Sequence, residues 1–102
     1  MNRLAPTEDD LIGNWVPAEG GLQADDTAKR IRWLTAHVLE KVADSPQYGA
    51  WEALFRDPAD GRFWERTYPM SEMHAGGPPR LTTISVAQAR AKYGADVART
   101  TG

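Results

Sequence analysis

The chain has 102 residues, 41% of them hydrophobic and 25% charged, which is typical of a single globular domain. Its formal net charge of −2 argues against a general binder of nucleic acid or of anionic membranes, because such proteins carry a basic face. The sequence has no cysteine, so disulfides, thiolate metal sites and a cysteine nucleophile are excluded. Acidic residues 8–10 interrupt any signal sequence and no apolar run could span a bilayer, so we expect a cytoplasmic protein.

The N-terminal part of the chain predicts a helical turn, then a short strand and a turn. Thr7 and Asp10 have the spacing of a capping box, which predicts a helical turn that ends at Gly13. Residues 14–16 predict a short strand, and the glycines at 20–21 predict the turn that follows it.

The clearest helix is predicted over residues 27–43, with Asp25 or Asp26 as its N-cap. Pro46 ends it, because the residue before a proline resists helical dihedrals. Apolar residues recur at spacings of three and four and so lie on one stripe of this helix: Ile31, Leu34, Val38 and Val42.

Residues 51–56 and 62–68 predict the two strands of a β-hairpin. Pro58 presets the dihedral angle of the turn, and Gly61 can adopt the positive φ that returns the chain to the second strand. We expect Asp57 to face Arg62 across the mouth of this turn, which fixes the register of the strands.

This register predicts that aromatic residues gather on one face of the hairpin. Phe55 pairs with Trp64 and Trp51 with Tyr68, so we expect this face to lie against the core. Arg66 lies on the same face, where its guanidinium can stack on the neighbouring rings.

Residues 80–84 predict a third strand. Ser85 and Gln88 form a second capping box, which opens a short helix that ends at Gly94. We expect residues 97–102 to be a frayed tail. The whole chain, 1–102, is therefore predicted to be one α+β domain: a small antiparallel sheet with a central β-hairpin, packed by one long helix and one or two short helices.

A loop dense in polar residues, glycine and proline follows the hairpin at residues 69–79. Long irregular segments with this much specified chemistry usually serve binding or catalysis, so we interpret the loop as the functional centre. Gly76 and Gly77 can let backbone approach backbone, and Pro78 stiffens the exit. A rigid loop of this kind loses little entropy when it binds a partner.

Two chemical interpretations of the loop find little support. His74 could act as a general base oriented by Glu72 or Asp60, but no activated nucleophile accompanies them. His37 could join both residues at a metal ion, but the spacing of the three is not diagnostic. We therefore predict no catalytic residue, no metal and no cofactor.

A long mixed motif runs through the hairpin and the loop: Trp51-Glu52, Leu54, Arg56-Asp57-Pro58, Asp60-Gly61-Arg62, Trp64-Glu65, Thr67-Tyr68-Pro69, Ser71-Glu72, His74 and Gly76 to Pro79. It resembles the motif of the immunity protein 27 family of bacterial polymorphic toxin systems. The resemblance implies a non-enzymatic antidote that binds and neutralises a cognate toxin domain. When alone, we expect the chain to be a monomer or a weak homodimer.

We predict that the hairpin tip and the loop contact this partner, through Asp57, Asp60, Arg62, Glu65, Ser71, Glu72 and His74, supported by Trp64, Tyr68, Gly61, Gly76, Gly77 and Pro78. The same motif can instead be mainly structural. Two other classes also remain open. One is a small hydrolase or isomerase that uses Glu65, Glu72 and His74, and the other is a structural module or homodimer that pairs an exposed strand edge with its copy.

Overall fold

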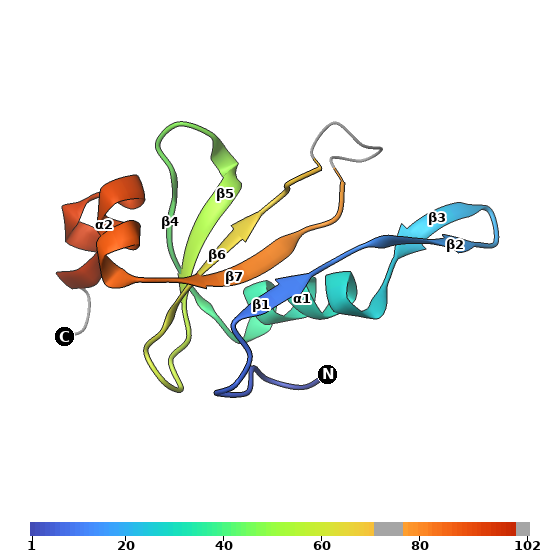
Figure 1. Cartoon of the computed structure of the whole chain (residues 1–102), viewed down its shortest axis with the longest axis horizontal. Helices are drawn as coiled ribbons and strands as arrows, with labels where there is room; N and C mark the ends of the chain where they lie inside the picture. The colour runs from blue at the N-terminus through green and yellow to red at the C-terminus, as the bar shows by residue number, and fades with distance from the viewer. Residues whose placement is uncertain (71–76, 100–102) are drawn as a thin grey trace.

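The computed structural model describes residues 1–70 and 77–99. Its strands are β1 (Asp10–Ile12), β2 (Trp15–Ala18), β3 (Gly21–Ala24), β4 (Glu40–Ser45), β5 (Gly49–Arg56), β6 (Phe63–Thr67) and β7 (Arg80–Ile84), and its helices are α1 (Asp26–His37), α2 (Val86–Tyr93) and the 3-10 helix η2 (Ala95–Arg99). Within these residues, five antiparallel strands form a sheet of order β1-β7-β6-β5-β4, while β2 and β3 form a separate two-stranded sheet (Figure 1). The predicted α+β class is confirmed.

The β5–β6 hairpin lies inside the sheet and has the predicted register. Phe55 pairs with Trp64, and Leu54 pairs with Glu65. Asp57 donates its backbone N–H to the carbonyl of Arg62 at 2.9 Å, so these two residues close the hairpin as expected. The register therefore sends Phe55 and Trp64 to one face of the sheet and Leu54 to the other.

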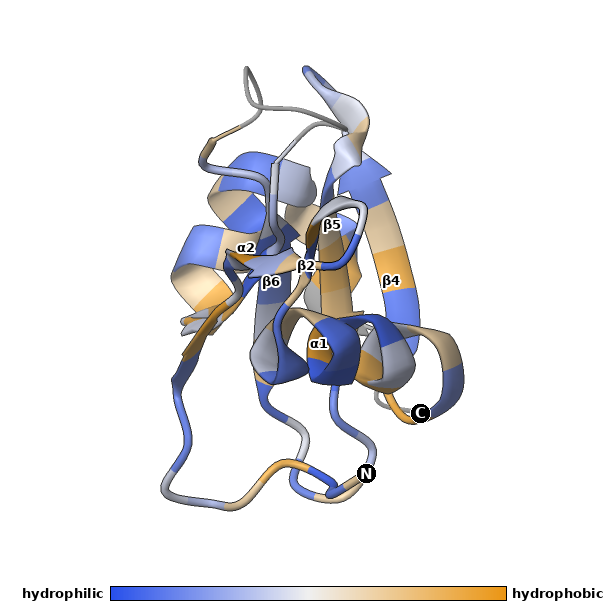
Figure 2. Ribbon diagram, turned by 90° about the vertical axis from the view of Figure 1, so that its right-hand side faces the viewer, coloured by the Kyte–Doolittle hydropathy of each residue, from blue (hydrophilic) through white to orange (hydrophobic). Residues whose placement is uncertain are grey.

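The sheet is buried on both faces. On the first face, α1 contributes Ile31 and Leu34 to a cluster with strand residues, the predicted aromatic core (Figure 2). The second face was not expected to be buried, but Leu54 and Phe63 pack there against α2 and η2. Burial on both faces explains how a chain of this size builds a core from strands of three to eight residues.

The long helix predicted over 27–43 is wrong at its C-terminal end. Asp25 is the N-cap, and its side chain accepts a hydrogen bond from the backbone of Ala28 at 2.8 Å, but α1 ends at His37. Residues 40–45 instead form β4, which pairs with β5. Val42 thus continues the helical spacing only by coincidence, because it packs with the cluster on the second face.

The helical turn predicted after Thr7 is also wrong, because Asp10–Ile12 form β1 at the edge of the sheet. Leu11 pairs with Leu81 of β7, a partner 70 residues away that no local pattern predicts. Arg80 adds a bidentate ion pair with Asp10, at 2.9 and 2.8 Å.

The C-terminal helix is confirmed with its caps. Ser85 and Gln88 form the reciprocal capping box, and Gly94 follows the last residue of α2. The predicted frayed tail begins too early, however, since Val97 in η2 is only 7% exposed and packs with Tyr93. Among the described residues, none of the helices is both long and apolar enough to cross a lipid bilayer.

Candidate partner-binding surface

The hairpin tip uses Asp57 to build the turn. Asp57 is 3% exposed, and its carboxylate accepts a hydrogen bond from the backbone of Ala59 at 2.9 Å. Gly61, at φ +78°, donates its backbone N–H to the carbonyl of Asp57 at 2.7 Å. The carboxylate of Asp57 therefore has a structural role and little surface with which to meet a partner.

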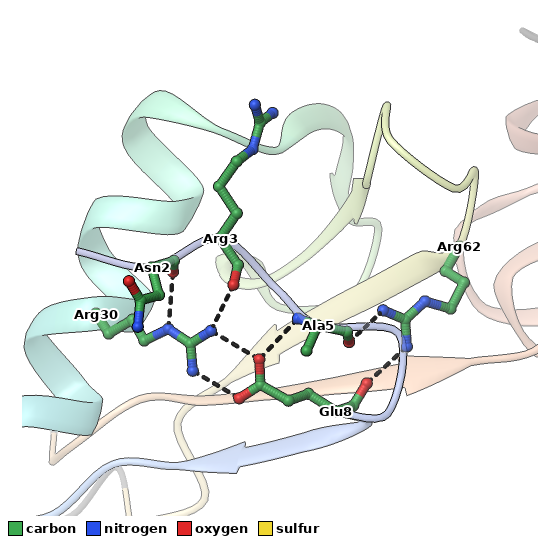
Figure 3. A network of polar contacts seen from close by, with 6 residues as sticks. All are labelled: Asn2, Arg3, Ala5, Glu8, Arg30 and Arg62. Atoms are coloured by element: carbon green, nitrogen blue, oxygen red, sulfur yellow. Dashed lines mark hydrogen bonds and ion pairs between the residues drawn. The ribbon is translucent and has the colours of Figure 1, made fainter.

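Arg62 joins the hairpin tip to the N-terminal segment (residues 1–9). Its Nη1 donates to the carbonyl of Glu8 at 2.6 Å, and its Nη2 donates to the carbonyl of Ala5 at 3.1 Å (Figure 3). The guanidinium also lies 4.9 Å from the centroid of the Trp64 ring, and Trp64 is fully buried. Arg62 is thus held by internal contacts on three sides.

Asp60 is the most accessible acidic residue of the predicted set within the described hairpin. Its carboxylate accepts hydrogen bonds from the Arg62 backbone at 3.0 Å and from the Arg62 side chain at 2.6 Å. Burial alone would raise the pKa of Asp60, but these two bonds lower it overall. About a third of its side chain (34%) stays exposed, so Asp60 can still present negative charge to a partner.

A second arginine, Arg30 of α1, holds the N-terminal segment from the other side, although it is not among the predicted site residues. Arg30 forms a bidentate ion pair with Glu8, at 2.6 and 2.7 Å, and donates to the backbone carbonyls of Asn2 and Arg3 (Figure 3). The bonds from Arg30, and then one from the Ala5 backbone, lower the pKa of Glu8 from 4.5 to about 2. No local spacing links residues 22 positions apart.

Glu65 belongs to a polar cluster beneath α2. Its Oε2 accepts a hydrogen bond from the hydroxyl of Tyr93 at 2.7 Å and pairs with Lys92 at 2.6 Å, so only 12% of its side chain is exposed. Lys92 also pairs with Glu52. Burial alone would lower the pKa of Lys92, but the bonds to Glu52 and Glu65 raise it overall. Burial and the bond from Tyr93 to Glu65 raise the pKa of Tyr93 well above its usual range.

The described residues of the predicted set are spread along β6 rather than gathered at one place. The β5–β6 turn, with Asp57, Asp60 and Arg62, lies at one end of β6 beside the N-terminal segment, whereas Tyr68 follows the other end (Figure 1). A strand of five residues separates the two ends by about 17 Å. Among the described residues, the structure thus separates the hairpin tip from the end of β6 that carries Tyr68. Ser71, Glu72, His74 and Gly76 lie outside the described residues.

Met70 and Gly77, which flank these residues, lie against each other. Gly77 has φ +78°, and a Cβ atom added to it would lie 2.2 Å from the carbonyl oxygen of Met70. The close backbone approach that we predicted is therefore confirmed for Gly77. Pro78 and Pro79 are buried, and the Pro79 carbonyl accepts the backbone N–H of Gly13 at 2.9 Å. The chain thus re-enters the sheet on a fixed path.

An exposed aromatic hollow lies at this same end of the sheet. Tyr48, Trp51, Glu52 and Tyr68 line a volume of about 400 Å³. Trp51 is 55% exposed, so its predicted place in the core is wrong; it lies toward the open end of β5 rather than among the residues that form the cluster with α1. Its ring instead meets Tyr68 edge-on, with centroids 5.5 Å apart. The predicted stacking of Arg66 is confirmed on Tyr68, at 5.4 Å, where the hollow begins.

The family model of immunity protein 27 matches residues 18–85, two thirds of the chain. The chain belongs to the immunity protein 27 family. Neither curated proteins nor solved structures gave a significant match. The matched range begins at the end of β2 and runs to the N-cap of α2, so it includes α1 and the whole β5–β6 hairpin. The matched range therefore supplies most of the cluster under α1 and the aromatic hollow, whereas Ala89, Tyr93 and Val97 of the second cluster lie beyond it.

The internal bonds divide the motif of immunity protein 27 by role. Asp57, Arg62 and Glu65 each bond to groups within the protein, so each stabilises the fold. Trp51 of the motif, and Tyr48 just before it, are instead at least half exposed. Apolar residues this exposed are typical of a surface that another protein covers.

Proposed function

We propose that the chain is the antidote of a bacterial polymorphic toxin system, which binds a cognate toxin domain in the cytoplasm and blocks it without catalysing a reaction. The observation that carries the proposal is membership of the immunity protein 27 family. Immunity proteins of such systems protect by complex formation, and a protein–protein complex requires an exposed surface with apolar anchors.

The end of the sheet where β5 begins and β6 ends best meets this requirement. Tyr48 and Trp51 supply aromatic area there, and aromatic residues dominate the binding energy of most protein interfaces. The segment between Met70 and Gly77 carries Ser71, Glu72 and His74, which we retain as polar contacts with the toxin. Among the residues of the hairpin tip, Asp60 is the one that we retain as a contact, at the far end of β6.

Co-expression tests the proposal directly. The chain is produced together with the C-terminal toxin domain encoded beside it, and growth rescue, co-purification and the dissociation constant from calorimetry are measured. We expect rescue and a tight one-to-one complex. A toxin that kills equally with and without the chain, and that does not co-purify with it, refutes the proposed function.

A double variant tests the polar contacts. Asp60→Ala with Glu72→Ala removes two carboxylates, and we expect the complex to weaken while the free protein remains folded. Asp44→Ala is the matched control, because Asp44 is exposed, makes only a surface pair with Lys41 at 2.7 Å, and is not among the predicted contact residues. An unchanged affinity in the double variant would place the polar contacts elsewhere.

A further inference from the structure

Arg66 differs from the other arginines in or beside the five-stranded sheet. Each of the others is paired with a carboxylate: Arg56 with Glu40, Arg62 with Asp60 and Arg80 with Asp10. Arg66 of β6 has no such pair within residues 1–70 and 77–99. The described fold therefore leaves its positive charge uncompensated.

The guanidinium of Arg66 is nevertheless held in place. Its Nη2 donates to the carbonyl of Ala50 at 2.6 Å. The guanidinium also lies 5.4 Å from the centroid of the Tyr68 ring and 5.5 Å from that of Phe55. These contacts orient the group, but the bond to Ala50 uses only one N–H of a guanidinium that carries several. The remaining donors are thus positioned for a partner before it arrives, which lowers the entropy cost of binding.

This guanidinium lies at the rim of the aromatic hollow. The rings of Trp51 and Tyr68 meet there at 84°, and Tyr48 completes the aromatic lining of about 400 Å³. The indole N–H of Trp51 and the hydroxyls of the two tyrosines can donate hydrogen bonds, and none of them does so to a described residue. The hollow therefore offers several donors to a group that accepts hydrogen bonds.

The charge beside these rings is positive. Glu52 also lines the hollow, but successive residues of β5 point to opposite faces of the sheet. Its carboxylate accordingly pairs with Lys92 of α2 on the second face, away from the Trp51 ring. Arg66 lies two residues before Tyr68 in the chain and shares its face. Of Glu52 and Arg66, only Arg66 presents its charge to the rings, so an acidic group is attracted to this place.

We propose that Arg66, at the hollow lined by Tyr48, Trp51 and Tyr68, binds an acidic side chain, aspartate or glutamate, of the toxin domain. The assignment of this side chain to the toxin rests on the function proposed above. The carboxylate accepts hydrogen bonds from the guanidinium, and the rings shield the ion pair from water, which strengthens the attraction. Arginine and exposed aromatic residues together are typical of the residues that dominate a protein interface.

Calorimetry with the toxin domain tests the charge. Arg66→Gln keeps a polar side chain but removes the positive charge, and we expect the complex to weaken about tenfold to hundredfold, as for a charge-assisted hydrogen bond. Arg90→Gln is the matched control, because Arg90 is exposed and lies in α2, which covers the second face. It makes the same change in net charge and should leave the affinity unchanged. An equal loss in both variants, or no loss in Arg66→Gln, overturns the proposal.

Salt and a second variant separate the ion pair from a loss of packing, because Arg66 also stacks on two rings. Sodium chloride screens charges, so the wild-type complex should weaken more steeply with added salt than the Arg66→Gln complex. Arg66→Lys keeps the charge but loses the planar fork, so it should bind with intermediate affinity and keep the steep salt dependence. Parallel salt dependences for the wild type and Arg66→Gln would refute an ion pair at this residue.

A double-mutant cycle identifies the group on the toxin. Each exposed aspartate or glutamate of the toxin domain is replaced in turn by asparagine or glutamine and titrated against the wild type and against Arg66→Gln. One replacement should weaken binding to the wild type about tenfold or more and have little further effect on Arg66→Gln. A toxin domain in which no acidic residue couples to Arg66 refutes the assigned occupant.

A titration without the toxin tests the hollow by itself. The probe is sodium acetate, and the control is acetamide, its neutral isostere, with sodium chloride added to equal ionic strength. The indole N–H signal of Trp51 in a ¹⁵N NMR spectrum, identified by its loss in Trp51→Leu, reports binding. We expect half-saturation by acetate at about 0.1 M, the affinity of a single charge-assisted pair, and no such response in Arg66→Gln. Equal shifts with acetate and acetamide, or an acetate response that survives Arg66→Gln, overturn the carboxylate site.

The two kinds of experiment separate the site from the function. A hollow that binds acetate while Arg66→Gln leaves the toxin affinity unchanged refutes its use in the complex. A wild-type chain that does not bind the toxin refutes the proposed function, and the acetate titration then decides the site alone.

Discussion

Replacing Arg62 with alanine should destabilise the protein by about 2–4 kcal/mol. The guanidinium gives two charge-assisted hydrogen bonds to backbone carbonyls, at 2.6 and 3.1 Å. Both carbonyls belong to half-buried residues that water can partly reach, so we assign about 1 kcal/mol to each bond. The stacking on Trp64 adds about 0.5–1 kcal/mol. The ion pair with Asp60, whose side chains are 26% and 34% exposed, adds less than about 1 kcal/mol.

Urea denaturation followed by tryptophan fluorescence measures this loss. Arg62→Lys is the matched variant: it keeps the positive charge but cannot reach both carbonyls and Asp60 together, so about half of the loss should return. Limited trypsin digestion provides a second measurement, because the freed N-terminal segment should be cut faster at Arg3. An Arg62→Ala protein within about 0.5 kcal/mol of the wild type would refute the structural role that we give to Arg62.

Two further predictions concern backbone strain and pH. Gly77→Ala should cost about 2–4 kcal/mol, because its Cβ would overlap the Met70 carbonyl, whereas Gly61→Ala has the same φ of +78° and open space and should cost about 1 kcal/mol. Equal melting temperatures for the two variants would contradict this prediction. The pKa of Glu8 is lowered from 4.5 to about 2, so its ion pair with Arg30 stabilises the fold fully above pH 4.5 and is lost as the pH falls toward 2. The free energy of unfolding of the wild type should therefore exceed that of Glu8→Gln by about 1–2 kcal/mol at pH 6, after allowance for solvent screening. In urea titrations this difference should vanish near pH 2. A difference that stays constant with pH would exclude the ion pair as its source.

Local chemistry predicts the parts of this fold in which neighbouring residues decide the structure. The turn residues Asp57 and Gly61 fix the hairpin register, and Ser85 with Gln88 starts α2, all as predicted. The predictions fail where pairing with a distant strand decides the secondary structure. Glu40 lies just after α1, in a segment whose apolar spacing predicts more helix. Its backbone instead pairs with Arg56 of β5, and the two side chains form an ion pair at 3.2 Å.

The candidate site was harder to predict than the fold, because it depends on which end of a strand each residue occupies. Tyr68 and Arg62 flank the same strand and belong to the same motif, yet they lie at its opposite ends. Trp51 was assigned to the core from its strand face alone, since the alternation of faces does not say how far a covering helix extends. Its distance along β5 from Phe55, which α1 does cover, explains its exposure.

The division of the motif into internally bonded and exposed residues bears on how the complex gains its energy. A side chain that already bonds within the protein must give up those bonds before it can bind a partner, so its net contribution is small. Asp57, whose carboxylate bonds within the hairpin turn, is such a residue. Trp51 gives up mainly water, and covering its exposed ring is favourable at roughly 25 cal/mol per Å². The binding energy should therefore concentrate at the aromatic end of the sheet, while the hairpin tip holds that end in position through β6.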